Sequence, residues 1–175
     1  MVFCLWITGI PGSGKSTIAK ELSDELKNKN TTVQILRLDE IRRIVTPNPD
    51  YSEKERNIVY RALAMMAKFL YDNKINVIID ATANKRDYRN LARNLMKNFF
   101  EIYVMCPIDV ASRRESNRVQ NLVQKELYKK AKEGKIQLPG INAVYEEPKN
   151  PELIIDSEKF SPKDAVAMII RILNL

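Results

Sequence analysis

The chain contains no histidine. Imidazole bases, imidazole metal ligands and Ser–His nucleophile pairs are therefore excluded, and any general base must be a carboxylate or a lysine. Cysteine is scarce as well, with only Cys4 and Cys106. Each cysteine lies in an apolar run typical of a central strand, so we expect two buried free thiols rather than a disulfide or a metal pair.

Long hydrophobic runs are also missing. No apolar run approaches the ~20 residues that span a bilayer, and the chain opens directly into a strand-like run without the features of a signal peptide. We therefore expect a cytoplasmic protein with no membrane partner. Its 175 residues, of which 45% are hydrophobic, are enough for one core and few for two domains. The prediction is a single domain over residues 1–175.

Three of the five glycines stand in one short stretch. Residues 9–17 read G-I-P-G-S-G-K-S-T and fill every fixed position of the phosphate-loop motif G-x-x-x-x-G-K-[ST]. A strand-like run precedes the stretch and helical spacing follows it, as the motif requires. We therefore predict that this loop binds ATP. The residues assigned to ATP are Gly9, Gly12, Ser13, Gly14, Lys15, Ser16 and Thr17.

The chemistry of this loop follows from its residue types. Backbone amides and the positive end of the following helix form a cradle for anions. Lys15 adds a positive charge for the outer phosphates, and the Ser16 hydroxyl is a ligand for Mg²⁺. A glycine-rich turn that merely caps a helix is the alternative, and it explains neither the lysine nor the hydroxyl.

Two carboxylates follow predicted strands. Residues 33–38 lead to Asp39, and residues 76–80 end at Asp80. Ligands of open α/β sheets bind beyond the carboxyl ends of the strands. Asp39 is therefore the catalytic candidate together with Lys15, Arg42 could hold an anionic substrate group beside it, and Asp80 could hold Mg²⁺ through water. The alternatives are a helix-start Asp39 paired with Arg42 and an Asp80 that caps the next helix.

Strand-like and helix-like segments alternate along the whole chain. This order predicts an α/β protein with the P-loop kinase fold, a five-stranded, mainly parallel sheet and helices on both faces. Ser52 and Glu55 form a capping-box pattern at the start of a long helix. We expect a broad apolar face of that helix to pack on the sheet, with its methionines in the core. That face comprises Ile58, Val59, Ala62, Leu63, Met65, Met66, Phe69 and Leu70.

The net charge of +7 is concentrated in one stretch, residues 113–135. Glu115, Glu126 and Glu133 are its only acids. We interpret this stretch, part of a predicted helix from residue 109 to about 132, as a lid that closes over phosphate groups; the alternative is a solvated basic helix. Its basic residues are Arg113, Arg114, Arg118, Lys125, Lys129, Lys130, Lys132 and Lys135.

Several stretches resemble the adenylylsulfate kinase (APS kinase) family. Residues 125–131 (K-E-L-Y-K-K-A) look like its K-G-L-Y-K-K-A segment, and residues 139–148 resemble its T-G-I-D-x-x-Y-E-x-P stretch. The resemblance implies transfer of the γ-phosphate of ATP to the 3′-hydroxyl of adenosine 5′-phosphosulfate (APS) in sulfate activation. By position it assigns Asp39 and Arg42 to the substrate motif D-G-D-N-x-R, Tyr51 to stacking on the acceptor adenine, and Arg56 and Lys125 to further substrate contacts.

The sequence differs from this family at Arg37, Leu38, Glu40 and Val59, where the family has Asp, Gly, Asn and Asn. Residues 80–84 with Arg89 resemble instead the D-x-T-N motif of P-loop polynucleotide 5′-hydroxyl kinases. A kinase for another acceptor is therefore the first alternative, and nucleic acid is a partner only there. The second is a nucleotide-gated switch without an acceptor. A homodimer is one assembly that the chain could form.

Overall fold

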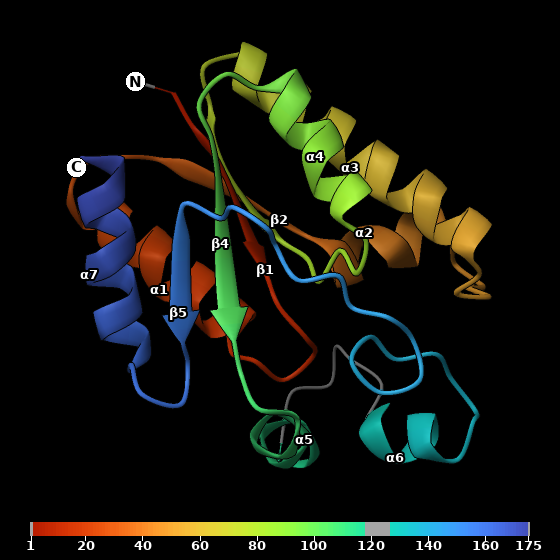
Figure 1. Cartoon of the computed structure of the whole chain (residues 1–175). Helices are drawn as coiled ribbons and strands as arrows, with labels where there is room; N and C mark the ends of the chain where they lie inside the picture. Colours follow the sequence, from red (N-terminus) through yellow and green to blue (C-terminus); the bar gives the residue numbers. More distant parts are fainter. Residues whose placement is uncertain (1, 118–126, 175) are drawn as a thin grey trace.

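The computed structural model describes residues 2–117 and 127–174. A parallel sheet of five strands forms its centre (Figure 1), in the order β2-β3-β1-β4-β5. All four strand pairings are parallel, so the carboxyl ends of the strands lie at one edge of the sheet. The predicted α/β fold is confirmed. The strands are β1 (Cys4–Thr8), β2 (Val33–Arg37), β3 (Asn76–Asp80), β4 (Phe99–Met105) and β5 (Leu153–Asp156).

Helices cover both faces of the sheet (Figure 1). On one face α1 (Lys15–Asn28) packs beside α7 (Pro162–Leu173), and on the other α3 (Glu53–Asp72) packs beside α4 (Arg86–Leu95). The short helix α2 (Leu38–Val45) follows β2 directly. Two more helices, α5 (Ile108–Ser116) and α6 (Leu127–Lys132), lie beyond the carboxyl ends of the strands, where a ligand would bind.

The central strand β1 builds both halves of the core. Its side chains alternate between the two faces, as the period of two in a strand requires. Cys4 and Trp6 face α3 and α4, whereas Leu5 and Ile7 face α1 and α7. All four are fully buried, so β1 holds the phosphate loop that follows it on a rigid support.

Serine caps start two of the helices, α3 and α7. The Ser52 hydroxyl accepts from the Glu55 amide at the start of α3, and Ser161 and Asp164 form a reciprocal capping box at the start of α7. The predicted capping box at Ser52 is only half formed. The Glu55 carboxylate reaches past Ser52 and accepts from the amides of Asp50 and Tyr51 instead.

The expectation that the broad apolar face of α3 packs on the sheet is wrong for half of its residues. Val59 and Leu63 are buried, but Ile58, Met65, Met66 and Phe69 are exposed. The sheet and α4 cover only one side of α3, because Tyr60, Ala64 and Ala67 complete the buried face in place of the expected residues. The methionines are therefore surface residues.

Two smaller expectations also need correction. Cys106 is a free thiol, as predicted, but it lies just beyond β4 and is half-buried. The basic stretch is not one helix, because α5 ends at Ser116 and a helix begins again at Leu127. Lys125, one of the predicted substrate contacts, lies outside the described residues. Within the described ranges no helix is long and apolar enough to cross a membrane.

Candidate active site

The phosphate loop fits tightly against its surroundings. Gly9 and Gly12 both have positive φ angles, +151° and +81°. A Cβ on Gly9 would collide with the Val104 carbonyl oxygen, and one on Gly12 with the Ala111 carbonyl oxygen. Only glycine allows this backbone path, which leaves room for a phosphate group close to the loop. The motif therefore sits between the ends of β1 and β4 and the start of α5.

Lys15 begins α1, and its side chain folds back over the loop. The ammonium group is buried and donates to the Ile10 carbonyl oxygen at 2.8 Å. Together with Gly12, Gly14, Ser16 and Thr17 it lines a cavity of about 320 Å³. The positive charge of Lys15, the backbone of the loop and the N-terminus of α1 suit this cavity to the phosphates of a nucleotide.

Asp80 is the last residue of β3 and lines the same cavity as Ser16. It does not cap the next helix, because α4 begins only at Arg86 with Lys85 at its N-cap. A serine hydroxyl and a carboxylate are hard oxygen donors of the kind that Mg²⁺ prefers, directly or through water. The two side chains therefore fit a magnesium ion beside bound phosphates.

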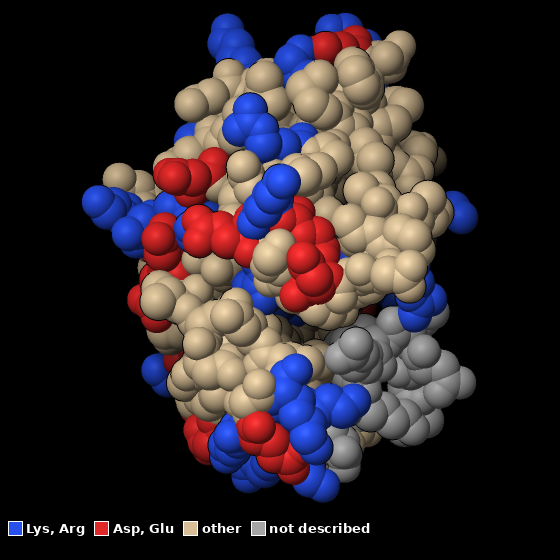
Figure 2. Space-filling view, turned by 90° about the vertical axis from the view of Figure 1, so that its right-hand side faces the viewer, with Lys and Arg blue, Asp and Glu red and all other residues tan. Residues whose placement is uncertain are grey.

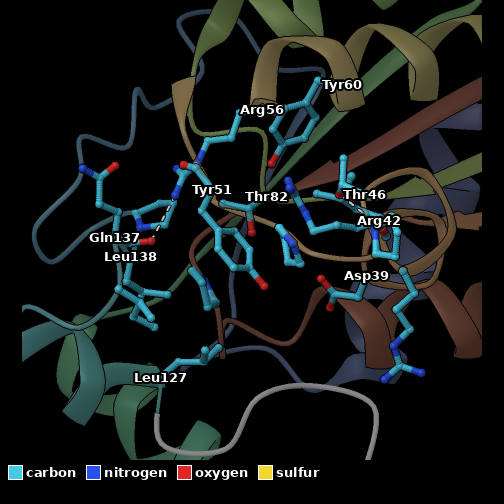
Figure 3. A pocket seen from close by; sticks show the side chains of 17 residues that line it. Asp39, Arg42, Thr46, Tyr51, Arg56, Tyr60, Thr82, Leu127, Gln137 and Leu138 are labelled. Carbon is cyan, nitrogen blue, oxygen red and sulfur yellow. Dashed lines mark hydrogen bonds between the residues drawn. The ribbon is translucent and has the colours of Figure 1, made fainter. Parts of the chain in front are cut away.

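A second, larger cavity adjoins the first (Figure 3). Its volume is about 500 Å³, in the range of pockets for small-molecule ligands. Tyr51 and Tyr60 give it aromatic surface, and Arg42, Arg43 and Arg56 give it positive charge. Aromatic faces and guanidinium groups together suit a planar ring that carries an anionic group.

Asp39 lies where the two cavities meet. The strand β2 ends at Arg37, one residue earlier than the predicted end at residue 38, so Asp39 stands in the first turn of α2. Asp39 and Thr82 both line both cavities. In Figure 3 the carboxylate of Asp39 and the hydroxyl of Tyr51 point into the same space. A carboxylate placed between a phosphate site and a neighbouring pocket can reach a hydroxyl group there.

Glu55 organises one wall of the larger cavity, although its spacing from Ser52 predicts only a helix cap. Its carboxylate forms an ion pair with the Arg42 guanidinium and accepts from the Tyr51 amide at 3.0 Å. Arg42 in turn lies 5.1 Å from the centre of the Tyr51 ring. Arg42 is therefore paired with Glu55, and its guanidinium group lies against the Tyr51 ring and helps to hold it in place.

Arg56 joins two segments that are far apart in the sequence. It is buried and donates from Nε to the Tyr51 carbonyl oxygen and from a terminal nitrogen to the Gln137 carbonyl oxygen, both at 3.0 Å. The start of α3 is thereby tied to the loop before Pro139, which also lines the cavity. Val59 faces the core, so the difference from the family pattern at that position lies outside both cavities.

A second support fixes the loop after β3. Ala83 has a left-handed φ of +45° and is fully buried. The Tyr60 hydroxyl accepts from its amide at 2.9 Å, and Arg89 donates to its carbonyl oxygen. Burial raises the pKa of Tyr60 to about 12, so the phenol stays neutral. Thr8, at the end of β1, donates to the Thr82 carbonyl oxygen at 2.6 Å. Contacts to its own carbonyl group and to the neighbouring Ala83 therefore hold Thr82 where the two cavities meet.

Arg89 belongs to this support and to neither cavity. It is 1% exposed and forms an ion pair with Glu101, Nε to Oε1 at 2.5 Å. Its third contact is the Glu146 carbonyl oxygen at 2.6 Å. A buried guanidinium whose three nitrogens all donate to protein oxygens holds loops together and is not available to bind a substrate. The structure gives Arg89 no place in an acceptor site.

The parallel sheet with a phosphate loop after its central strand, and a second cavity beside the phosphate site, define a P-loop phosphotransferase. Comparison with known proteins identifies the family within this class. The family model described as adenylylsulphate kinase matches residues 1–156. The chain therefore belongs to the adenylylsulfate kinase family, whose members transfer a phosphoryl group to an alcohol.

Individual relatives agree with this assignment. The chain is 38% identical over 160 residues to the probable adenylyl-sulfate kinase of Archaeoglobus fulgidus, covering 91% of this chain and 98% of that protein. It is 36% identical to the adenylyl-sulfate kinase of Thermodesulfovibrio yellowstonii, covering 97% and 82%. The solved structure of the Mycobacterium tuberculosis APS kinase in complex with AMPPNP and APS superimposes with a TM-score of 0.88 at 28% identity, covering 99% and 98%.

Proposed function

We propose that the chain transfers the γ-phosphate of ATP to the 3′-hydroxyl of APS, which gives 3′-phosphoadenosine 5′-phosphosulfate. The observation that carries this proposal is the position of Asp39, which lines both the phosphate cavity and the larger cavity beside it. A donor in one cavity and an acceptor in the other would meet at this carboxylate. Because ATP is the donor, we place the reaction in the cytoplasm.

The donor side of the proposal rests on the phosphate loop. The backbone amides of Gly12 to Thr17 and the Lys15 ammonium group would hold the β- and γ-phosphates, as in other P-loop enzymes. Ser16 and, through water, Asp80 would hold Mg²⁺, which neutralises charge on the phosphates during transfer. Lys15 would balance the charge of the γ-phosphate most directly, because it lies at the start of α1 within the cavity.

The acceptor side rests on Tyr51 and the arginines around it. The Tyr51 ring would stack on the adenine of APS, and Arg56 would contribute a contact from the same wall. Arg42 would act mainly by holding Tyr51 in place through the contacts described above. Lys125 remains a substrate contact expected from the family resemblance alone.

The reaction forms a bond between the acceptor oxygen and the γ-phosphorus and breaks the bond from that phosphorus to the β–γ bridging oxygen. ADP leaves with the electron pair, and the hydroxyl proton passes to the Asp39 carboxylate or through it to water. Because the transition state is loose, the carboxylate contributes mainly by orienting the hydroxyl.

An acceptor panel tests the proposal. The enzyme is incubated with ATP labelled at the γ-position and with APS, adenosine 5′-phosphate or a 5′-hydroxyl oligonucleotide, and the labelled products are separated. We expect label on APS with a kcat/KM at least about 100-fold above either other acceptor, which corresponds to about 2.7 kcal/mol of discrimination. Preferential labelling of the oligonucleotide would support the polynucleotide kinase alternative. Slow ATP hydrolysis with no labelled acceptor would support the switch.

A further inference from the structure

Five of the described residues line both cavities, and three of them are apolar. The apolar ones are Pro11 of the phosphate loop, Leu38 at the start of α2 and Leu127 at the start of α6. The polar ones are Asp39 and Thr82. In Figure 3 Leu127 approaches the larger cavity from the side of α6. Since the three apolar residues come from three separate segments, they border the junction of the cavities together, and we call them the apolar collar.

The carboxylate of Asp39 does not by itself distinguish the acceptor from water. A carboxylate that orients a hydroxyl group toward the γ-phosphate can orient a water molecule in the same way. The water oxygen would then form the bond to the γ-phosphorus, the bond to the β–γ bridging oxygen would break, and ADP would leave with the electron pair. The water proton would pass to Asp39 or to solvent. The choice between transfer and hydrolysis therefore depends on what can stand beside this carboxylate.

The larger cavity is open to the surface, and Asp39 is exposed. Figure 2, which looks onto the side where α3 begins, shows a hollow between the part of the molecule that carries α3 and the charged residues around α6. Lining residues of the larger cavity come from both parts, for example Tyr51 before α3 and Gln137 after α6. Water can therefore enter this cavity, and its exclusion from the γ-phosphate must come from the surface beside Asp39.

We propose that the apolar collar makes the enzyme select a carbon-bound hydroxyl group over water at the γ-phosphate. A water molecule held inside a protein makes about three hydrogen bonds, and the three apolar side chains offer it none. The ribose of a nucleotide acceptor instead brings carbon atoms that pack against the collar while its hydroxyl group meets Asp39. The inference rests on the proposed function, because it concerns the same phosphoryl transfer.

Contacts behind the collar keep it in place. Leu38 is 7% exposed and packs into the core between the sheet and α3. The Tyr128 hydroxyl donates to the Pro11 carbonyl oxygen at 2.6 Å, which joins α6 to the phosphate loop. The Leu127 amide donates to the Glu115 carboxylate at 3.1 Å, which joins the start of α6 to α5. The collar is therefore part of the folded framework, and a ligand does not have to assemble it.

Leu38 makes the collar a feature of this particular chain. It stands where the family pattern has glycine, which has no side chain to border the junction. Arg37 and Glu40 also differ from that pattern, but they line neither cavity and form an ion pair with each other at 3.2 Å. Of the three differences between the end of β2 and the start of α2, Leu38 is thus the one that reaches the site of transfer.

Phosphate release without an acceptor tests the collar. The wild-type enzyme with ATP and Mg²⁺ should release inorganic phosphate slowly. Leu38→Ala and Leu127→Ala each remove apolar surface from the junction, so release should rise about tenfold, which corresponds to about 1.4 kcal/mol in the barrier to hydrolysis. Transfer of label to APS should not rise with it. The ratio of release to transfer is the deciding quantity, because a general loss of stability would lower both rates together.

Two further variants serve as controls. Leu36→Ala removes the same atoms from a partly buried side chain that packs on the same core but lines neither cavity. Leu38→Met keeps an apolar side chain of similar size at the junction. Both should keep the wild-type ratio of release to transfer. Thermal unfolding of every variant shows whether it is folded, and Leu127→Ala carries the test alone if Leu38→Ala does not fold, since Leu127 is only half-buried.

Unchanged phosphate release in the folded alanine variants of the collar would overturn the proposal. An equal rise in Leu36→Ala, or a Leu38→Met variant that releases phosphate as fast as Leu38→Ala, would overturn it as well. If APS receives no label, the proposed acceptor is wrong, but phosphate release still decides whether the collar keeps water from the γ-phosphate. The two failures are therefore distinguishable.

Discussion

The Glu55 carboxylate holds the Arg42 guanidinium and the Tyr51 backbone amide at the same time. Both charged side chains are about nine-tenths buried, at 10% and 11% exposed. Tyr51 needs this support, because its φ of +56° lies in the left-handed region that residues other than glycine rarely adopt. A carboxylate in the first turn of α3 thus fixes the position of the Tyr51 ring in the larger cavity.

Glu55→Gln should therefore damage acceptor binding without touching ATP binding. The amide group keeps the size but removes the charge that Arg42 requires, which leaves a buried cation and costs about 3 kcal/mol of stability. We expect the KM for the acceptor to rise about tenfold or more, while the KM for ATP changes less than about twofold.

Glu53→Gln is the control for this prediction, since Glu53 lies two residues before Glu55 and pairs with Lys85 on the surface. Steady-state kinetics and thermal unfolding of both variants make the comparison. Equal effects of the two substitutions, or an equal rise in both KM values for Glu55→Gln, would contradict the positioning role.

Tyr51 itself should act through its ring and not through its hydroxyl. Tyr51→Ala removes the aromatic surface of the cavity and should raise the acceptor KM about tenfold, because stacking and burial of one ring contribute about 1.5 kcal/mol. Tyr51→Phe should remain within about twofold of the wild type. The decisive measurement is the pair of KM values for acceptor and ATP; a larger change for ATP would move Tyr51 to the donor side.

Substitutions at Tyr60 and Ala83 should change stability in opposite directions. Tyr60→Phe removes the acceptor of the buried Ala83 amide and should cost about 1–3 kcal/mol in the free energy of unfolding. Ala83→Gly relieves the left-handed backbone and should stabilise the protein by about 1 kcal/mol. Urea unfolding of both variants measures these values, and a destabilised Ala83→Gly would argue against strain at this residue.

The sequence predicts which residues meet at the phosphate cavity, because the signals for them are local. The phosphate loop lies within nine consecutive residues, and Asp39 and Asp80 were found because strands that end at one edge of a parallel sheet bring their following residues together. None of this required knowledge of contacts between distant segments.

The contacts that hold the walls of the larger cavity could not be predicted in the same way. The Ser52–Glu55 spacing is typical of a capping box, and nothing local indicates that the carboxylate instead reaches Tyr51 and Arg42. The contact between Tyr60 and Ala83 joins residues on α3 and beyond β3, so only the packed fold reveals it. Periodicity also places Met65 on the apolar face of its helix without showing that the sheet leaves this side chain exposed.

Stability toward acid should depend on Asp164 in the capping box of α7. The hydroxyl of Ser161 and then its backbone amide hold the pKa of Asp164 below its usual value. A carboxyl whose pKa is lower in the folded state stabilises the fold above its unfolded pKa of about 3.9 and loses this effect as the pH falls through the folded value.

The melting temperature of the wild type should therefore exceed that of Asp164→Asn at pH 7, and the difference should shrink as the pH drops below about 4. Ser161→Ala, which removes the partner hydroxyl, should abolish most of the pH dependence of that difference. Thermal unfolding from pH 3 to pH 7 provides the measurement, and a constant difference over this range would refute the role of the ionised carboxylate.

The last prediction concerns Asp39, on which the enzymatic proposal depends most. Asp39→Asn keeps the size of the side chain and most of its hydrogen bonding but removes the charge. If the carboxylate accepts or orients the acceptor hydroxyl, kcat should fall by roughly 10²- to 10⁴-fold, the usual contribution of a positioned acid or base. The KM values for ATP and acceptor should change little.

The size of the loss in kcat distinguishes the roles that Asp39 could have. If it only starts α2, asparagine should replace it with little effect, since the two residues are comparably good near a helix start. Because little charge develops on the attacking oxygen in a loose transition state, a loss at the small end of the range would indicate orientation rather than proton removal. A kcat within about twofold of the wild type is too small an effect for either role and would remove Asp39 from the catalytic site.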